Sequence, residues 1–287
     1  MGLSYIPLYP RCRFTGCTPG GYGLRGFLLS TKRGRRIMCL MQSTESPDPA
    51  GQDARDIEPQ FLRPPSARQR AAMYVDGFNL YHALNDLGQP HLKWLNLQAV
   101  ARLLVAGRPE DVVRIVFCTA VPTQSVEKQN RHRLYVRALE GTGVTVFKGH
   151  FSEEPRHCRK CGHQWQHPTE KEGDTSLAIT VIDDAHRDRF DVAYLVSADG
   201  DHAPVARMIR DGFPSKRLVT VAPPNRQHNF KIRDAAHSKS AITADLVEKC
   251  LFGRAVPDEN GNMVIRPPAY DPPPGWVAPQ DRPKKGG

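Results

Sequence analysis

The stretch that decides the fold is Tyr74-Val75-Asp76-Gly77-Phe78-Asn79-Leu80-Tyr81. Tyr74 and Val75 end a short apolar run, which predicts a buried strand that stops at Asp76, and Gly77 follows as a chain breaker. In parallel α/β sheets the functional site lies beyond the carboxyl ends of the strands. The sequence therefore predicts that Asp76 is part of such a site.

Outward from this stretch, strand-like and helix-like segments alternate along residues 72–250. Strands are predicted at residues 112–120, 144–151, 192–196 and 218–221, and helices at residues 97–105, 125–140, 170–187 and 201–210. This alternation predicts an α/β fold with a parallel sheet that helices cover on both faces. We expect one folded domain over residues 71–254, a basic disordered leader and linker over residues 1–70, and a Pro-rich tail over residues 255–287.

Four aspartates are expected to meet at the carboxyl edge of the sheet. Asp76 ends the first strand, Asp199 and Asp201 follow a later strand, and Asp174 opens a helix. At ~4 Å and an effective dielectric of about 20, each like-charge pair costs roughly 4 kcal/mol, so the cluster needs protons or a divalent cation. Carboxylate oxygens suit Mg²⁺ or Mn²⁺, which support phosphoryl chemistry. Any one of these aspartates could instead be a helix N-cap, and Asp201 fits that role because Pro204 lies in the first turn.

Three segments, in this order, resemble the motifs of NYN domains, a PIN-like nuclease group that includes LabA-like bacterial proteins. They are Val75-Asp76-Gly77-Phe78-Asn79-Leu80, Glu170-Lys171-x-x-Asp174 and Ser197-Ala198-Asp199-Gly200-Asp201. The resemblance covers about residues 72–250. It implies a Rossmann-like PIN fold and cleavage of RNA that depends on Mg²⁺ or Mn²⁺ held by the four aspartates.

The resemblance also implies roles for neighbouring residues. Asn79 would orient a phosphate or a metal-bound water, Ser197 would support the strand-end turn on the substrate side, and Glu170 would be a further ligand or outer-shell group. The chain departs from the usual motifs at three positions beside the aspartates: Thr175, Gly200 and His202. None of these departures removes a carboxylate, but they leave the level of activity open.

Residues 150–168 form a cysteine- and histidine-rich insert between a predicted strand and a predicted helix. Cys158 and Cys161 have the Cys-x-x-Cys spacing that lets two thiolates bind one zinc ion, and His163 and His167 are the candidates to complete a tetrahedral site. His150 and, more weakly, His157 are alternatives. The zinc would be structural and would stabilise a short insert that has little core. A reduced thiol pair without metal and a redox pair remain as alternatives.

Two groups of basic residues could contact the phosphates of RNA. One lies on the predicted helix 125–140 and the other follows Pro223-Pro224; in chain order they are Lys128, Arg131, Arg133 and Arg137, then Arg226, Lys231, Arg233 and Lys239. The second group follows a strand end, so we expect Arg226, Lys231 and Arg233 to bind substrate. The first group fits an ordinary solvated helix face equally well. Phe230 is the one aromatic residue suited to base stacking there.

The net charge of +10 is weak evidence for RNA binding. Residues 1–44 hold seven basic and no acidic residues, so the remaining 33 basic and 30 acidic residues leave only +3. This leader could be a transit peptide, a basic tail, or an extension before a start at Met38 or Met41. No apolar run reaches the ~18 residues of a membrane span, and we expect a cytoplasmic protein without membrane contact. Self-association stays open.

Three functions are compatible with these patterns. The leading hypothesis is a metal-dependent ribonuclease, and the alternative is an RNA- or protein-binding regulator whose site is catalytically weak. The third is a haloacid-dehalogenase-type phosphatase with Asp76 as nucleophile. That chemistry needs a second aspartate two residues later, and Phe78 occupies this position.

Overall fold

The computed structural model describes residues 27–30, 36–39, 67–122 and 125–283. Contacts divide the chain into two units, Met1–Arg63 and Pro64–Gly287. In the first unit β1 (Phe27–Ser30) and β2 (Arg36–Cys39) form an antiparallel hairpin. The rest of the predicted leader and linker, up to residue 66, lies outside the described residues. No helix in the described parts of the chain is long and apolar enough to cross a bilayer.

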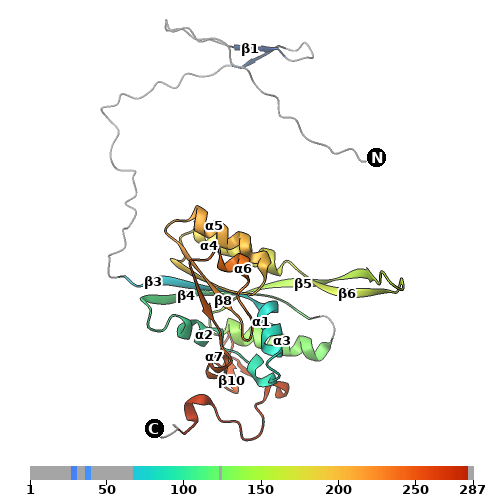
Figure 1. Cartoon of the computed structure of the whole chain (residues 1–287), viewed down its shortest axis with the longest axis vertical. Coiled ribbons are helices and arrows are strands. Elements are labelled where there is room, and N and C mark those ends of the chain that lie inside the picture. The colour runs from blue at the N-terminus through green and yellow to red at the C-terminus, as the bar shows by residue number, and fades with distance from the viewer. Residues whose placement is uncertain (1–26, 31–35, 40–66, 123–124, 284–287) are drawn as a thin grey trace. The chain divides into compact units, whose positions relative to one another are not determined.

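The second unit is built on a seven-stranded sheet in the order β6-β5-β4-β3-β7-β8-β9 (Figure 1). Its strands are β3 (Gln69–Asp76), β4 (Glu110–Ala120), β5 (Thr145–His157), β6 (Gln164–Lys171), β7 (Val192–Val196), β8 (Arg217–Ala222) and β9 (Ser238–Ala241). All neighbours pair in parallel except β5 and β6. The prediction of a parallel-sheet α/β fold is confirmed.

Helices cover both faces of this sheet (Figure 1). One face carries α1 (Gly77–Asn85), α2 (Leu97–Leu104) and α3 (Val126–Glu140), and the other carries α4 (Gly173–His186), α5 (Ala203–Gly212) and α6 (Phe230–Arg233). The short α7 (Ala244–Lys249) lies beside α2. Four 3₁₀ turns connect these elements: η1 (Pro90–Lys93), η2 (Gly200–His202), η3 (Pro268–Tyr270) and η4 (Pro279–Asp281).

Strand β3 is the centre of the sheet and belongs to two hydrophobic cores. Met73 and Val75 pack into the core under α1 and α2, whereas Ala72 and Tyr74 pack into the core under α4 and α5. This alternation follows from the two-residue period of a strand, which sends successive side chains to opposite faces. All six residues from Ala71 to Asp76 are buried, as expected for a central parallel strand.

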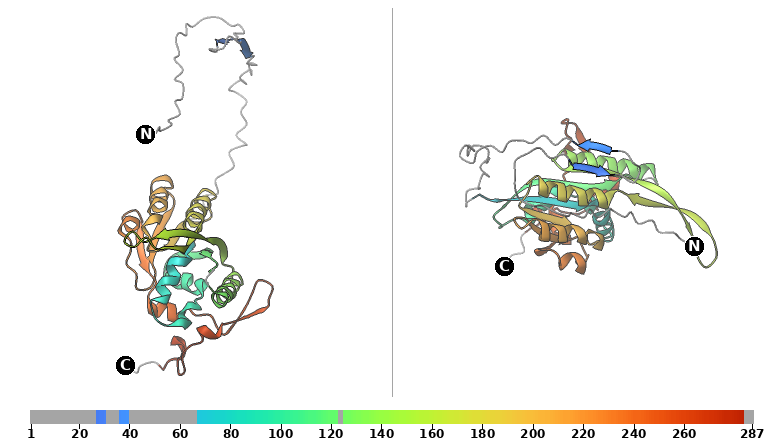
Figure 2. Two further views of the ribbon diagram at one scale, coloured as in Figure 1. Left: turned by 90° about the vertical axis from the view of Figure 1, so that its right-hand side faces the viewer. Right: turned by 90° about the horizontal axis from the view of Figure 1, so that it is seen from above.

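The cysteine- and histidine-rich insert is not a separate module but the end of a two-stranded arm. β5 continues past its parallel partner β4 and pairs with β6 from His150 opposite Lys171 to His157 opposite Gln164. The arm projects beyond the rest of the sheet in Figure 1 and in the right-hand view of Figure 2. The antiparallel strand β6 was not predicted.

The segment after residue 254 is part of the folded body. β10 (Ala255–Pro257) and β11 (Met263–Ile265) form an antiparallel hairpin beside α3, and Val256 and Val264 are buried in the core. Trp276 donates from its indole N–H to Glu248 of α7 at 2.9 Å. Residues 255–283 therefore fold against the domain, although their composition predicted a Pro-rich tail.

Candidate metal centre

Asp76 lies where β3 meets α1, and its carboxylate is held from two sides. Oδ1 accepts the backbone N–H of Asn79 at 2.9 Å, so Asp76 caps α1. Oδ2 accepts the hydroxyl of Ser197, at the end of β7, at 2.9 Å. Only 7% of Asp76 is exposed to solvent. A buried carboxylate with both oxygens positioned in this way has a fixed orientation at the edge of the sheet.

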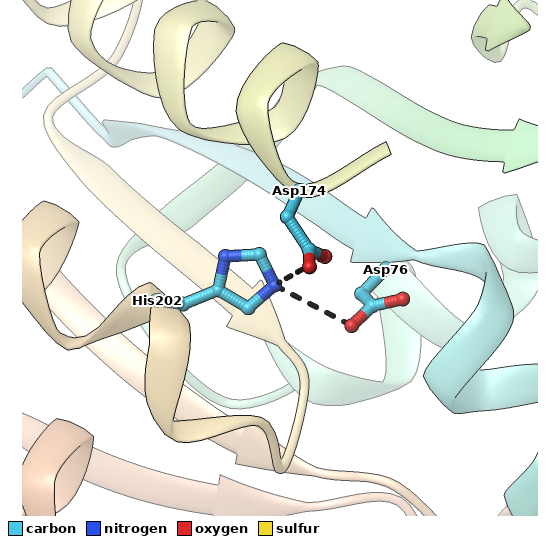
Figure 3. A group of neighbouring side chains, drawn as sticks. All are labelled: Asp76, Asp174 and His202. Atoms are coloured by element: carbon cyan, nitrogen blue, oxygen red, sulfur yellow. Dashed lines mark hydrogen bonds and ion pairs between the residues drawn. The ribbon is translucent and has the colours of Figure 1, made fainter. Parts of the chain in front are cut away.

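Two further side chains approach Asp76 from the face of the sheet that α4 and α5 cover (Figure 3). Asp174 is in the first turn of α4, and His202 ends η2 before α5. The Nε2 atom of His202 lies 3.4 Å from Asp76 Oδ2 and 3.4 Å from Asp174 Oδ1. One ligand atom from each residue lies within 4.8 Å of the others, and no other group of three such ligands occurs among the described residues.

The charges in this group favour a positive centre between the two carboxylates. Burial on its own would lower the pKa of His202, but hydrogen bonds to Asp174 and Asp76 and their negative charges raise that pKa to about 9. The hydrogen bond from His202 conversely lowers the pKa of Asp174. The two carboxylates therefore favour a positive charge at the Nε2 atom of His202, the same atom that could bind a divalent cation in its neutral form.

Asp199 and Asp201 are near this group but are not members of it. Asp199 Oδ1 accepts the backbone N–H of Asp201 at 3.0 Å and so caps η2. The Asp201 side chain is exposed to solvent. The helix-cap role considered for Asp201 is wrong, because Asp199 caps η2 and His202 occupies the cap position of α5. The metal-ligand roles predicted for Asp199 and Asp201 stay predictions.

Asn79 and Ser197 connect the two halves of the site. Asn79 Oδ1 accepts the backbone N–H of Ala198 at 3.1 Å, which ties α1 to the loop after β7. The Ser197 hydroxyl accepts the backbone N–H of Asp199 at 3.0 Å while it donates to Asp76. Ser197 is only 1% exposed, so its place is behind Asp76 rather than on a surface that substrate can reach.

His202 is the residue that the sequence patterns did not select. It counted as a departure from the family motif, because an apolar residue is usual after Asp201. Its signal was its position, since it directly follows the strand-end segment that also carries Asp199. The 3₁₀ turn η2 rotates its ring toward Asp76 and Asp174, and sequence spacing does not reveal a turn of that kind.

Gly77 has a packing role at the start of α1. A Cβ atom at this position would lie 2.5 Å from the carbonyl oxygen of Cys118 and 2.8 Å from the ring of Phe117. The glycine therefore lets α1 begin directly against β4. At Gly200 a Cβ atom would meet the side chain of Asn229 at 2.8 Å.

Part of the second basic group lies on helix α6, near the Asp-Asp-His group, and its predicted role in substrate binding stays a prediction. Helix α6 contacts η2, and it exposes Lys231, Arg233 and Phe230. Arg233 pairs with Asp234 at 2.9 Å, and Arg226 pairs with Asp86. Lys231 and Arg233 thus lie on the element next to His202.

The tip of the β5–β6 arm is the turn 158–163. The backbone N–H groups of Cys161 and Lys160 and the side chain of Cys161 form hydrogen bonds with Cys158, which lower the pKa of its thiol. The ring of His163 stacks on Trp165. His167 pairs in register with Glu154 in the arm, and its side chain lies outside the described residues, as does that of Glu170. The zinc site at this tip remains a prediction.

His150 lies too far from the tip to complete that site. It lies seven positions before His157 along β5, which corresponds to about 23 Å at ~3.3 Å per residue. Its ring lies 3.5 Å from a carboxylate oxygen of Glu172, at the base of the arm.

A cavity of about 490 Å³ opens on the α1 and α3 side of the same edge. Gly77 and Phe78 of α1, Thr119 and Ala120 of β4, and Arg131 of α3 are among the residues that line it. Asp76 belongs to the Asp-Asp-His group, and the next residue, Gly77, lines the cavity, so the two sites are neighbours in the chain. No sequence pattern predicted this cavity, because its walls come from segments far apart in the chain.

A mostly parallel sheet with helices on both faces is a Rossmann-like arrangement, and the Asp-Asp-His group lies at the carboxyl edge of this sheet. Residues 70–239 match the family model of the NYN domain, and the chain belongs to that family, which is part of the PIN-like nuclease superfamily.

Two individual proteins are similar to this chain over about two thirds of its length. The chain is 25% identical over 228 residues to the 6-hydroxy-3-succinoylpyridine 3-monooxygenase HspA of Pseudomonas putida, covering 66% of this chain and 72% of that protein. It also matches the crystal structure of a protein of unknown function from Vibrio parahaemolyticus with a TM-score of 0.42 and 20% identity, over 65% of this chain and 98% of that one.

Proposed function

We propose that this protein hydrolyses RNA phosphodiester bonds with a divalent cation held by Asp76, Asp174 and His202. The observation that carries the proposal is the convergence of these three side chains, from three separate elements, within 4.8 Å at the carboxyl edge of an NYN domain. A divalent ion bound there lowers the pKa of water and offsets the charge that develops on a phosphate.

The donor set favours Mn²⁺ over Mg²⁺. Carboxylate oxygens suit both ions, whereas an imidazole nitrogen suits the later transition metals and is a poor ligand for Mg²⁺. Asp76 and His202 are buried, while the Asp174 side chain is 60% exposed. An ion and a phosphate oxygen can therefore reach the group from the side of Asp174.

Residues around the centre have supporting roles in this proposal. Ser197 and the backbone N–H of Asn79 fix the two oxygens of Asp76, so the carboxylate needs little rearrangement when it binds an ion. Lys231 and Arg233 on α6 would contact the phosphates of the chain next to His202. The exposed Asp201 is available to bind a second ion or its water shell.

The test is digestion of an end-labelled single-stranded RNA by the purified full-length protein with Mn²⁺, with Mg²⁺ and with EDTA. The informative variant is Asp174→Asn, because Asp174 is at the solvent-exposed side of the group. Asp183→Asn on the same helix α4 is the matched control, because Asp183 pairs with Arg187 on that helix's surface, away from the Asp-Asp-His group. We expect the wild type and Asp183→Asn to cleave with Mn²⁺ and Asp174→Asn to lose about 100-fold in rate or more.

Two outcomes contradict the proposal. One is RNA left intact under all metal conditions by a protein whose folding is confirmed by circular dichroism. The other is cleavage that EDTA and Asp174→Asn leave unchanged, which indicates a contaminating nuclease. Intact RNA together with salt-sensitive binding would instead identify the protein as a catalytically weak RNA-binding regulator.

A second candidate function comes from the Pseudomonas relative, whose name describes oxygenation of a hydroxypyridine that carries a succinoyl group. The aromatic and basic lining of the cavity beside Asp76 is the observation that favours it. Incubation with that compound, dioxygen and reduced nicotinamide would then consume oxygen. No oxygen uptake, together with Mn²⁺-dependent RNA cleavage, excludes this candidate.

A further inference from the structure

The cavity between α1, α3 and η3 lies beside the metal centre but is separate from it. Gly77, the neighbour of Asp76, and Tyr270 of η3 are both among the residues that line it. Consecutive Cα atoms are about 3.8 Å apart, so the cavity wall at Gly77 is one residue away from Asp76. Its volume of about 490 Å³ lies in the usual ~300–1,000 Å³ range of small-molecule sites.

Aromatic rings form much of the cavity wall. Phe78 and Tyr81 on α1 are large side chains that remain 48% and 42% exposed. The ring of His82 contacts both in edge-to-face geometry, with centroid distances of 4.4 Å to Phe78 and 5.6 Å to Tyr81. Further in, Tyr135 donates its hydroxyl to the carbonyl of Leu95, which fixes its ring in the wall. Exposed rings of this kind are the stacking surfaces that nucleic-acid-binding proteins offer to bases.

Positive charge gathers at the same place. Lys93, Lys128 and Arg131 line the cavity, and the described lining residues include no carboxylate. The Nζ atom of Lys93 lies 4.8 Å from the centroid of the Tyr81 ring. Burial lowers the pKa of Lys93, and the charges of Arg131 and Lys128 lower it further, so the three cations repel one another. An anion bound among them would relieve this repulsion.

We propose that this cavity binds one nucleotide of the RNA, with its base against Phe78 and Tyr81 and its phosphate against Lys128 and Arg131. The inference rests on the proposed function, and it adds a nucleotide subsite on the α1 side of the scissile bond. A planar ring and an anion in one small ligand match the two features of the wall. A peptide or an acyl chain would leave one of those features without a partner.

The experiment measures binding of adenosine and uridine monophosphates to the full-length protein by isothermal titration calorimetry in EDTA. Ribose 5-phosphate is the probe without a base. We expect both nucleotides to bind at least about five-fold more tightly than ribose 5-phosphate, the gain that stacking of one base provides. Phe78→Ala and Arg131→Ala should each weaken nucleotide binding about five-fold or more, and Arg133→Ala on the same helix α3 should not, because Arg133 does not line the cavity.

The outcomes of this experiment distinguish failure of the proposed nucleotide subsite from failure of the proposed nuclease activity. Asp174→Asn should keep nucleotide binding in EDTA while it loses Mn²⁺-dependent cleavage. Mn²⁺-dependent cleavage without nucleotide binding, or binding that Phe78→Ala and Arg131→Ala leave unchanged, overturns the subsite and leaves the nuclease proposal standing. Nucleotide binding without any cleavage refutes the nuclease proposal instead. A pyridine carboxylate that binds more tightly than either nucleotide, with the same loss in both variants, assigns the cavity to a small aromatic acid and overturns the inference.

Discussion

Protonation of His132 should destabilise the fold in acid. This residue lies on α3 and lines the cavity, and its Nε2 atom is buried without a hydrogen-bond partner among the described residues. Burial lowers the pKa of His132 to about 4, and the positive charge of Lys148 adds to the effect. The folded protein therefore keeps this imidazole neutral over a range of pH in which the unfolded chain protonates it.

The sign and size of the effect follow from linkage. Between pH 6.5 and pH 4 the unfolded state binds more protons at this site, so the free energy of unfolding falls as the pH falls. At about 1.4 kcal/mol per pKa unit, the full effect is about 3 kcal/mol, and most of it is reached at pH ~4.5. A loss of that size is a large part of the ~5–15 kcal/mol by which typical domains are stable.

The assay is urea unfolding of the wild type and of His132→Phe, each at pH 7.5 and pH 4.5. Phenylalanine keeps a planar ring in the wall but cannot be protonated. Other groups also titrate in this range, so the informative quantity is the difference between the two proteins in their acid-induced loss. We expect His132→Phe to lose about 2 to 3 kcal/mol less than the wild type, whereas the exposed control His186→Gln should behave like the wild type. Equal losses in wild type and His132→Phe would refute the reasoning.

Three further predictions concern the site, the core and the arm. Gly77→Ala should lower the free energy of unfolding by about 1–3 kcal/mol or more, because its Cβ atom would lie 2.5 Å from the carbonyl oxygen of Cys118. The control is Gly212→Ala, whose Cβ atom would meet no neighbour, and equal melting temperatures for the two variants would contradict the prediction. Asp184→Asn should cost about 3 kcal/mol by denaturant unfolding, because the buried carboxylate accepts from Tyr74, Arg114 and Arg189, while the surface control Asp183→Asn should cost less than about 1 kcal/mol. Protein produced in the presence of zinc should contain one zinc ion at the β5–β6 arm by metal analysis. Cys158→Ser should lose this ion while the unfolding of the rest of the domain stays unchanged. If the Cys158→Ser protein has the same zinc content as the wild type, the ion is bound elsewhere.

The elements with strong periodic signals were predicted from the sequence. Strand β7 has the expected bounds Val192–Val196, and α3 begins after Ser125, whose side chain caps it. These segments are recognisable from their local sequence, since β7 is a run of five apolar residues and α3 follows a residue suited to cap a helix. The location of the candidate site at the carboxyl edge of the sheet was also predictable, since parallel strands end at the same edge and Asp76 ends the first of them.

The parts that were missed depend on contacts between distant segments. Strand β6 holds Pro168 and several polar residues, and it forms because β5 extends beyond the sheet and pairs with it. β10 and β11 are three residues each, and they persist because Val256 and Val264 are buried in the core. One turn of 3₁₀ helix brings His202 close to Asp76 and Asp174, and no periodic sequence pattern predicts such a turn.

The central position of β3 has a consequence for synthesis on the ribosome. Asp76 receives its hydrogen bond from Ser197, which lies 121 residues later in the chain. At about 5–20 residues per second, some 6 to 24 seconds pass between the synthesis of these two residues. Until β7 is made, β3 can pair with β4 but has no partner on its other edge, and until α4 is made a nascent chain exposes Ala72 and Tyr74 of the second core. The time during which a chaperone could bind this strand is therefore set by the same topology that brings Asp76, Asp174 and His202 together.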